Sequence, residues 1–330
     1  MLRKSLFCAG ILFCLACQAQ TKPKAIPIIF DSDMGPDYDD VGAITLLHAF
    51  ADSGRVKILA TMASTKYECV ACVMSVFNTY FNRPGIPVAV PKGNAQLLRD
   101  WQHWTDTLIA DYPHAIKTNE EAADAVELYR RILSKQPDRS VTIVTTGFLT
   151  NLSNLLQSKP DKYSNLDGRA LVKQKVNNLV CMAGKFPSGT EFNVEKDAVA
   201  SQNVFSKWPT GILLSGFEIG QKIKTGLPLI HNKNIRNSPV KTVFNICIPM
   251  AKEDSAGRMS WDETAVLVAV KGPEPFYHLR YGHMQVAADG SDIWINSGKR
   301  QAHLVEAVSP EIVQAYINKL IMHQPVKRSN

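Results

Sequence analysis

The chain has 330 residues, of which 45% are hydrophobic and 20% are charged, and its formal net charge is +7. This is enough apolar material for the core of one large domain or of two small ones. The basic residues are scattered and form no stripe with aromatic side chains, which argues against a surface for nucleic acid; the positive excess indicates a solvated surface.

The N-terminal residues have the pattern of a secretory signal. A basic start precedes an apolar run over 6–16, which is too short to span a membrane, and small residues follow it. Two kinds of processing remain open: cleavage after Ala19, with 1–19 as a signal peptide, or lipidation of Cys17 in the imperfect lipobox CLAC, which we favour. Both predict export, to the periplasm or to a lipid anchor in the cell envelope. No other stretch is long and apolar enough to span a bilayer.

Strands and helices alternate along the rest of the chain. In chain order we expect a strand at 25–31, a helix at 40–50, a strand at 56–64, a helix at 67–81, a strand at 86–93, a helix at 119–135, a strand at 140–147, a helix at 149–158, strands at 176–184 and 210–216, a helix at 261–272, a hairpin at 284–296 and a helix at 309–323. Unbroken apolar strands alternating with helices predict an α/β fold, with a mainly parallel central sheet and helices on both faces. We find no repeat or linker and expect a single domain over 25–325.

Two cysteines of the helix at 67–81 form a CxxC motif. Cys69 and Cys72 lie among apolar residues at helical spacing. Core cysteines or a local disulfide are therefore favoured over redox or metal chemistry.

Polar clusters follow four of the expected strands. They occupy 31–40, 145–151, 182–193 and 215–218, and a fifth cluster, RMSWDE at 258–263, begins a helix. Binding sites of parallel sheets form where strands end, at the C-terminal edge. We therefore expect these clusters to converge on one site.

The first cluster holds five aspartates between Asp31 and Asp40. Neighbouring carboxylates repel and raise one another's pKa, so the crowding indicates either a cation among them or a solvated turn. Ligands that are all oxygen suit Ca²⁺ or Mg²⁺. An EF-hand is excluded, because Gly35 stands at the fifth position and no glutamate at the twelfth. Three alternatives stay open: a phosphatase with Asp31 as nucleophile and Asp33 as acid, non-catalytic sugar or cation binding, and an acidic turn that begins a helix.

Four motifs together resemble the nucleoside hydrolase family. DSDMGPDYDDVGAITLL is similar to the family's D-x-D-P-G-x-D-D signature, with two extra residues before the last Asp-Asp. TTGFLTNLSNLL resembles G-P-L-T-N-x-A, and VCMAGKFPSGTEFNVEKDAVA resembles the M-G-G loop followed by A-E-F-N-x-x-x-D-P-x-A. WDETAVLVAV resembles H-D-x-x-A-V. The motifs keep the family's order from about Ile28 to about Val270.

The resemblance implies a Rossmann-like nucleoside hydrolase fold and hydrolysis of the N-glycosidic bond of ribonucleosides by a Ca²⁺-activated water, with release of base and ribose. Asp33 would take the proton from the water. The implied calcium ligands are Asp33, bidentate Asp40, Asp262 and the backbone carbonyl of Thr146. The implied substrate-binding residues are Asp39, Met182, Glu191, Asn193 and Trp261. The family also suggests a homodimer or homotetramer, and export suggests scavenging of nucleosides outside the cytoplasm.

The chain departs from the family where the nucleobase would bind. Trp261 replaces the histidine that helps to protonate the leaving base in many members, and it either stacks on a base or packs in the core. The residues considered as replacement acids are Arg258, Tyr281, His278 and His283. Lys185, in the loop before Glu191, could favour a ribosyl substrate that is negatively charged or differently substituted near the 5′ position, or it could simply face solvent. The alternative function is an exported calcium-containing protein that binds a ribosyl compound or sugar without hydrolysing it.

Overall fold

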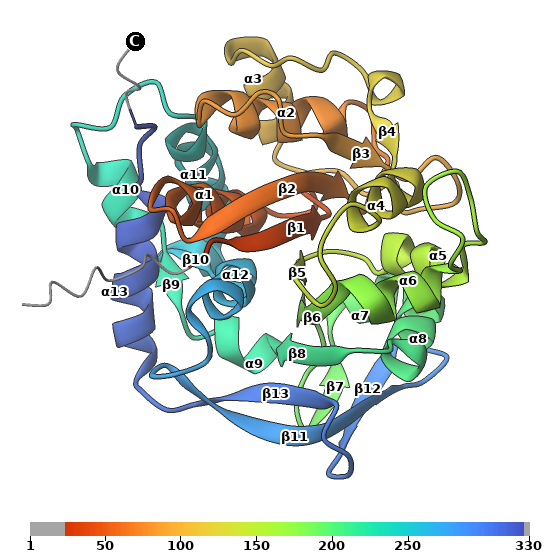
Figure 1. Ribbon diagram of the computed structural model, residues 1–330. Coiled ribbons are helices and arrows are strands. Elements are labelled where there is room, and N and C mark those ends of the chain that lie inside the picture. The colour runs from red at the N-terminus through yellow and green to blue at the C-terminus, as the bar shows by residue number, and fades with distance from the viewer. Residues whose placement is uncertain (1–23, 327–330) are drawn as a thin grey trace, which may run out of the picture.

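The computed structural model describes residues 24–326, so the predicted signal at 1–19 and its Cys17 lie outside the described residues. The strands are β1 (Ile26–Ser32), β2 (Val56–Ala63), β3 (Val88–Val90), β4 (Ala123–Asp124), β5 (Val141–Thr145), β6 (Val176–Met182), β7 (Ser188–Thr190), β8 (Gly211–Ser215), β9 (Lys224–Thr225), β10 (Arg258–Met259), β11 (Tyr277–Val286), β12 (Ser291–Ile295) and β13 (Gln301–Glu306). Within the described residues, eleven of them form one sheet in the order β4-β3-β2-β1-β5-β6-β8-β13-β11-β12-β7. The strands from β4 to β13 are parallel, whereas β11, β12 and β7 are antiparallel additions (Figure 1). The predicted α/β fold with a mainly parallel sheet is confirmed.

Helices cover both faces of the sheet (Figure 1). They are α1 (Asp39–Asp52), α2 (Val70–Tyr80), α3 (Trp104–Asp111), α4 (Ala125–Leu133), α5 (Thr150–Gln157), α6 (Gly168–Lys175), α7 (Phe192–Lys196), α8 (Ala198–Lys207), α9 (Phe217–Gly220), α10 (Leu227–His231), α11 (Pro239–Met250), α12 (Trp261–Lys271) and α13 (Pro310–Ile321), with 3₁₀ turns η1 (Asn119–Glu121) and η2 (Lys252–Asp254). None of these described helices is long and apolar enough to cross a membrane.

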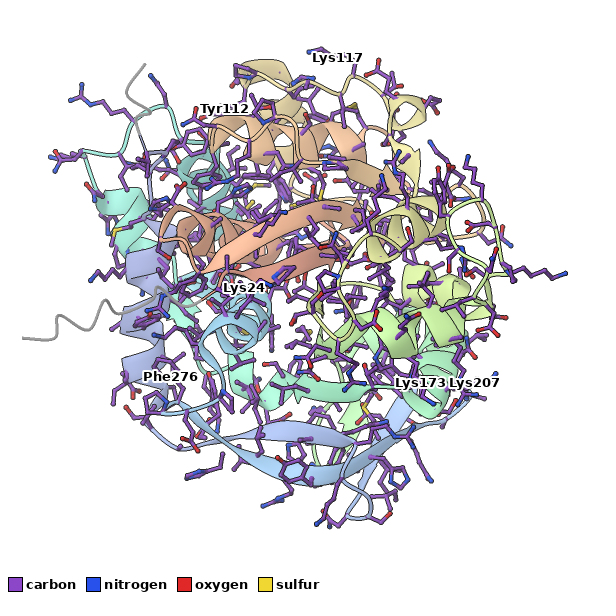
Figure 2. The ribbon with its side chains drawn as sticks, in the orientation of Figure 1. Lys24, Tyr112, Lys117, Lys173, Lys207 and Phe276 are labelled. Atoms are coloured by element: carbon purple, nitrogen blue, oxygen red, sulfur yellow. A yellow bond between two sulfur atoms is a disulfide. The ribbon has the colours of Figure 1, made fainter. Side chains whose placement is uncertain are left out.

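The two helix layers enclose two apolar cores. Side chains of α1, α2, α11, α12 and α13 pack on one face of the sheet, and those of α4, α5, α6 and α8 pack on the other. Strand β1 contributes to both, because Ile28 and Phe30 point to the first core and Ile29 to the second. Side chains fill the space between the layers, while an exposed residue such as Lys117 lies at the outer rim (Figure 2).

The register of the parallel strands aligns the ends that carry polar clusters. Asp31 of β1 pairs with Thr145 of β5, and Thr145 pairs with Cys181 of β6. Met182, the last residue of β6, pairs with Ser215 of β8. Four chain segments that lie far apart in sequence therefore leave the sheet side by side at its C-terminal edge, as expected.

The helix expected over 119–135 is wrong in its first half. Asn119–Glu121 forms a 3₁₀ turn, and Ala123–Asp124 is a short strand that pairs with β3. Helix α4 begins only at Ala125, where Asp124 Oδ1 accepts a hydrogen bond from the Glu127 amide at 2.9 Å. Strand pairing and this N-cap outweigh the helix propensity of the preceding glutamates and alanines.

The antiparallel part of the sheet was predicted only in part. The hairpin at 284–296 is confirmed, since β11 and β12 pair in antiparallel register. Strand β13 was not expected, although it lies between β8 and β11 and joins the two parts of the sheet.

Of the alternatives for the CxxC motif, the structure shows the local disulfide, between Cys69 and Cys72 at the start of α2.

Helix α1, which begins with Asp39 and Asp40, and helix α12, which carries Asp262, approach each other closely at Gly42. A Cβ atom on Gly42 would lie 2.6 Å from Cδ of Glu263, well inside van der Waals contact. Glu263 is fully buried, and neither of its carboxylate oxygens has a hydrogen-bond partner among the described residues. Glycine at position 42 is thus a packing requirement of this helix pair.

We expect Gly42→Ala to lower the free energy of unfolding by about 1–3 kcal/mol, because an added methyl group overpacks the helix contact. Most of this loss should disappear in a Glu263→Ala background, since the clash is with that side chain. Chemical denaturation of the four proteins of this cycle measures both effects. Gly85→Ala is the matched control, because a Cβ there meets nothing within 4 Å; equal losses at Gly42 and Gly85 would contradict the prediction.

Candidate active site

All the site residues predicted from the sequence line one cavity of about 180 Å³ at the C-terminal edge of the sheet. They are Asp33, Asp39, Asp40, Thr146, Met182, Glu191, Asn193, Trp261 and Asp262. The cavity, called the acidic pocket below, also has Pro36, Asp37, Phe192 and Phe217 in its wall. The structure therefore brings the predicted residues together, while their individual roles stay predictions.

Asp31 supports the pocket from below without lining it. Its carboxylate is fully buried and accepts hydrogen bonds from the Tyr129 hydroxyl at 2.8 Å and from Asn151 Nδ2 at 3.2 Å. Its backbone carbonyl accepts the Thr146 amide at 2.8 Å. Burial raises the pKa of Asp31 to about 7. Because this carboxylate is enclosed and already bonded, the geometry argues against a phosphatase with Asp31 as nucleophile.

Asp40 stands at the start of α1 and faces the ends of β1 and β5. Its Oδ1 accepts hydrogen bonds from Ser32 Oγ at 2.5 Å and from Thr146 Oγ1 at 3.0 Å. Burial and the neighbouring Asp39 carboxylate raise the pKa of Asp40 to about 6. The two hydroxyl bonds fix one oxygen of Asp40 and leave the other directed to the remaining acids.

Asp33 and Asp262 are the acids in the pocket with the least compensation. Burial raises the pKa of Asp33 well above its usual value, and the Asp40 carboxylate raises it further. Burial and the Asp39 and Asp40 carboxylates do the same to the pKa of Asp262. Buried carboxylates that oppose one another in this way favour a bound cation, and their oxygen atoms are the ligands of a hard ion.

The described residues do not form a pre-organised cluster of metal-ligating side chains. No three of their histidine, cysteine, aspartate or glutamate side chains are arranged closely enough to hold an ion. Asp40, however, interacts with both Asp33 and Asp262, and Thr146 lies in the same wall. The chemistry of this donor set fits a hard divalent cation, and the three carboxylates with the Thr146 carbonyl are the residues that would hold it.

The Asp39 carboxylate joins α1 to α12. Its Oδ1 accepts bonds from Arg258 Nε at 3.2 Å and Nη2 at 2.8 Å, and its Oδ2 accepts the amides of Trp261 at 3.1 Å and Asp262 at 3.2 Å. Asp39 thereby caps α12, whose N-cap residue Ser260 makes no side-chain cap. Burial alone would raise the pKa of Asp39, but Arg258 and the backbone amides hold it below its usual value. Its lone pairs are all used here, so the bond to a ribose hydroxyl stays a prediction.

Arg258 is the buried counter-charge of this acidic region. Its guanidinium also pairs with Asp37, and its Nη1 lies 3.8 Å from Asp254 Oδ2. Its Cζ lies 5.0 Å from the centre of the Tyr38 ring and 5.2 Å from that of Trp261. Among the described residues, every ion pair to an acid of the pocket comes from Arg258. Carboxylates on its edge and rings on its faces satisfy a guanidinium fully.

Glu191 and Asn193 hold the wall opposite α12. Glu191 caps α7, since its carboxylate accepts the amides of Asn193 at 2.9 Å, Val194 at 3.2 Å and Gly184 at 3.3 Å. Burial raises the pKa of Glu191 to about 7. Asn193 Nδ2 donates to the Thr146 carbonyl at 3.4 Å and to the Met182 carbonyl at 3.5 Å. These long bonds link the ends of β5 and β6.

One side of the pocket is aromatic and is formed by Trp261, Phe217 and Phe192. Trp261 donates its indole N–H to the Phe217 carbonyl at 2.7 Å, and the two rings lie 5.2 Å apart at an angle of 31°. Trp261 lines the pocket and packs on Phe217 and on the neighbouring core, whereas its stacking on a base stays a prediction. Phe192, which is 43% exposed, faces the same cavity. The indole N–H is committed to the protein, so it is not free for a nucleobase.

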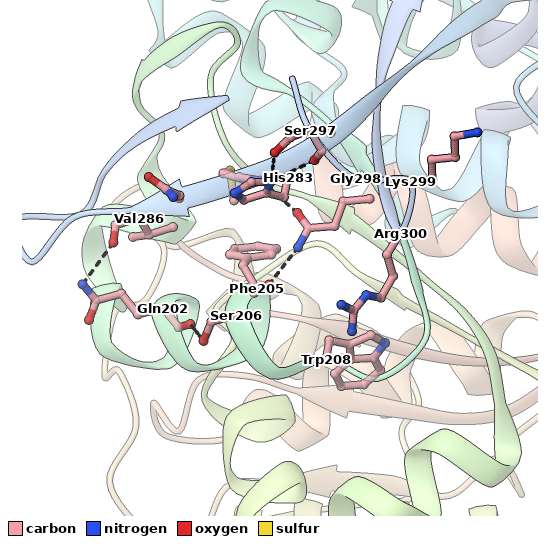
Figure 3. A pocket seen from close by; sticks show the side chains of 14 residues that line it. Gln202, Phe205, Ser206, Trp208, His283, Val286, Ser297, Gly298, Lys299 and Arg300 are labelled. Carbon is pink, nitrogen blue, oxygen red and sulfur yellow. Dashed lines mark hydrogen bonds between the residues drawn. The ribbon is translucent and has the colours of Figure 1, made fainter. Parts of the chain in front are cut away.

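The replacement acids considered for the leaving base do not line the pocket. His278, Tyr281 and His283 lie on β11. Arg258 is not among the lining residues and is held by Asp37, Asp39 and the ring of Trp261. His283 belongs to a separate cavity of about 650 Å³ between α8 and β11, where its Nδ1 lies 3.0 Å from the Ser297 carbonyl (Figure 3). That cavity contains no residue of the acidic pocket.

Lys185 is exposed and stands at the edge of the aromatic wall. Its Nζ lies 5.1 Å from the centre of the Phe217 ring, and its backbone amide donates to Asp292 at 3.1 Å. Glu218, next to Phe217, accepts the following backbone amide, that of Phe186. The carboxylates of Asp292 and Glu218 would repel a negatively charged 5′ substituent. The surroundings of Lys185 therefore favour the alternative in which this side chain faces solvent.

Four residues of the wall were not predicted as site residues, although all four lie inside motifs or clusters recognised in the sequence. Asp37 belongs to the aspartate run, and its side chain is 45% exposed towards the pocket although it pairs with Arg258. Phe192 directly follows Glu191, and Phe217 follows the end of β8. Pro36 directly precedes Asp37 in the aspartate motif, so position within a recognised motif or cluster is the clue that all four share.

The chain is similar to known nucleoside hydrolases in sequence. The family model described as inosine-uridine preferring nucleoside hydrolase matches residues 28–313. The pyrimidine-specific ribonucleoside hydrolase RihA of Enterobacter sp. (strain 638) is 29% identical over 246 residues, which cover 69% of this chain and 68% of that protein. RihA of Shewanella sp. (strain ANA-3) is 28% identical over 233 residues, or 68% of this chain and 66% of the relative.

Solved structures show the same fold. The plant nucleoside hydrolase PpNRh1 superimposes with a TM-score of 0.70 at 20% identity, covering 90% of this chain and 99% of that one. The inosine-uridine preferring nucleoside hydrolase of Bacillus anthracis gives a TM-score of 0.68 at 15% identity, and the purine-preferring ribonucleoside hydrolase of Gardnerella vaginalis gives 0.67 at 16%; each covers 90% of this chain and 99% of the other.

Arg258→Met should lower the free energy of unfolding by about 3–5 kcal/mol, because it leaves buried carboxylates without their counter-charge. Denaturant titration followed by circular dichroism measures the change. Lys222→Met is the control, since Lys222 pairs with Glu306 on the surface; there the expected loss is about 0–1 kcal/mol. Similar losses for the two variants would show that the Arg258 pairs do not stabilise the fold more than a surface pair does.

Proposed function

The chain belongs to the inosine-uridine preferring nucleoside hydrolase family, and on that premise we propose that it hydrolyses the N-glycosidic bond of ribonucleosides with a bound Ca²⁺ ion, releasing ribose and the free base. One observation carries the proposal: motifs from four distant parts of the sequence line a single pocket at the strand ends. The family is generally metal-dependent; an all-oxygen donor set suits Ca²⁺ or Mg²⁺, and the resemblance to the family favours calcium.

The acids of the pocket supply the chemistry of bond cleavage. As the base leaves, positive charge develops on the ribosyl ring, and buried carboxylates around the sugar stabilise it. Asp33 takes a proton from the attacking water, and Glu191 and Asn193 hold ribose hydroxyls. Water that attacks the face opposite the leaving base inverts the configuration at C1′, as in other glycoside cleavage.

The cation would be held by Asp33, Asp40, Asp262 and the carbonyl of Thr146. When bound, calcium supplies positive charge that lowers the pKa of a neighbouring water and attracts the ribose hydroxyls. The buried carboxylates that otherwise repel one another support this assignment. Met182 lies in the wall beside them, where an apolar side chain can pack on the sugar ring.

The proposal for location and assembly rests on the sequence. The predicted signal supports export to the periplasm or a lipid anchor at Cys17, and the family resemblance supports a homodimer or homotetramer. A nucleoside or another small ribosyl compound is the partner that the pocket suits. An exported hydrolase of this kind would release bases and ribose outside the cytoplasm for salvage.

We expect Asp33→Asn to lower kcat for ribonucleoside hydrolysis by about 10²–10⁴-fold, because the amide cannot accept the water's proton. Calcium affinity, measured separately by calorimetry, should be largely kept. The assay follows ribose release from purine and pyrimidine nucleosides, with and without a calcium chelator. Asp138→Asn is the matched control, since Asp138 is an exposed acid that pairs with Lys175.

The same assay distinguishes the enzyme from the binding protein considered as its alternative. An enzyme of this kind releases ribose in a chelator-sensitive way. A protein that binds calcium and ribosyl compounds but never releases ribose, with any substrate, would contradict the proposed hydrolysis and support the sugar-binding alternative.

A further inference from the structure

We propose that the preferred substrates of the acidic pocket are ribosyl compounds whose base is already a cationic aromatic ring, such as an N-ribosylpyridinium or an N7-alkylated purine ribonucleoside. The inference rests on the proposed hydrolysis and specifies its substrate class. It follows from two properties of the pocket: its proton donors are all committed to the protein, and its walls are acidic and aromatic.

A neutral base and a cationic base differ in what their departure requires. When the C1′–N bond of a neutral nucleoside breaks, the bonding electron pair stays on the base. The base then departs as an anion unless an acid within hydrogen-bonding reach protonates it. In an N-ribosylpyridinium, the same electron pair cancels the positive charge on the ring nitrogen, and the base leaves neutral. The water oxygen bonds to C1′, and the water proton passes through Asp33 to solvent. This second reaction balances without an acid on the base side.

The neutral donors of the pocket are already in use. Among the described residues that line it there is no histidine, lysine, tyrosine or cysteine. The Trp261 indole N–H donates to the Phe217 carbonyl at 2.7 Å, and the Thr146 hydroxyl donates to Asp40 at 3.0 Å. The Asn193 amide donates to backbone carbonyls. None of these groups can protonate a leaving base without breaking a bond that holds the wall.

Most of the acids of the pocket are held as hydrogen-bond acceptors. Asp37 and Asp39 pair with the Arg258 guanidinium. Glu191 accepts three backbone amides, and Asp40 accepts two hydroxyls. In each of these bonds the carboxylate oxygen is the acceptor, so these side chains are oriented to receive hydrogen bonds and not to donate one to a leaving base.

The aromatic walls also attract positive charge. Each of the three rings already interacts with a basic group: Lys196 Nζ lies 5.6 Å from the centre of Phe192, Lys185 Nζ lies 5.1 Å from that of Phe217, and Arg258 Cζ lies 5.2 Å from that of Trp261. Lys185 and Lys196 are exposed, so a cationic base would take their place over the rings while both side chains turn to solvent. Cations bind ring faces through the negative potential of the π system. A flat cationic base between such rings, above a floor of carboxylates, is complementary to the pocket in shape and in charge.

The experiment compares pairs of substrates that differ in charge and little in shape. With the full-length calcium-loaded protein, kcat/KM is measured for nicotinamide riboside against its neutral dihydro form, and for 7-methylguanosine against guanosine, with uridine and inosine as further neutral substrates. We expect the cationic member of each pair to be hydrolysed at least about 100-fold more efficiently, the usual range of a missing general acid.

A Trp261→His variant supplies the donor that the wall lacks, and Trp261→Phe is its matched control. The ratio of cationic to neutral kcat/KM should fall by at least about tenfold in the histidine variant and stay high in the phenylalanine variant. A Lys185→Met variant that loses turnover of neutral nucleosides alone would show that Lys185 donates the proton, which overturns the inference.

The outcomes separate the inference from the proposed function. Neutral nucleosides cleaved as efficiently as their cationic partners would overturn the inference and leave the hydrolase intact. Failure to cleave any of the substrates, with calcium bound, would overturn the hydrolase and with it the inference.

Discussion

The Asp39 carboxylate lies between α1 and α12, the two helices that carry Asp39, Asp40 and Asp262, and it is bonded to both sides of that contact. It starts α1, accepts the guanidinium of Arg258 and accepts the first amides of α12. The position of Asp262 and the orientation of Trp261 follow from this cap, because both residues stand in the first turn of α12. Gly42 lets the same two helices approach closely one turn further along α1. Without this contact, the acids from β1 and those from α12 would have no common pocket.

The compensation of charge explains how so many carboxylates can be buried together. A buried carboxylate is costly unless it is paired or well hydrogen-bonded. Arg258 pairs with Asp37 and Asp39, while backbone amides satisfy Glu191. Within the described residues, Asp33 and Asp262 have no such basic partner, and neighbouring carboxylates repel them. Asp37, Asp39 and Glu191 are therefore held by other groups of the protein, whereas Asp33 and Asp262 are available to bind a cation, although all five belong to similar short motifs.

Much of the fold and nearly all of the candidate site could be predicted from the sequence, because both depend on local patterns. The apolar runs ending at Asp31, Thr145 and Met182 identify strands, and parallel strands must end at one edge of the sheet. The start of α4 was placed wrongly, since Asp124 pairs with β3 before it caps the helix. Strand β13 pairs with β8, which lies about ninety residues before it, and Arg258 pairs with Asp39, which lies more than two hundred residues before it. No local pattern records such distant partners.

The acidic and the aromatic sides of the pocket, proposed to bind the sugar and the base, differ in how firmly the backbone fixes them. Asp33, Thr146 and Met182 follow directly from strand ends, so the sheet register determines where they lie. Trp261 and Phe217 meet through a side chain that bonds to a neighbouring carbonyl, and a substitution there changes chemistry without moving the sheet. A histidine at position 261 could serve as an acid, whereas the tryptophan has given its only N–H to the protein. If the proposed hydrolysis holds, the residues fixed by the strand ends would bind ribose, and single side chains such as residue 261 would decide which leaving groups are released.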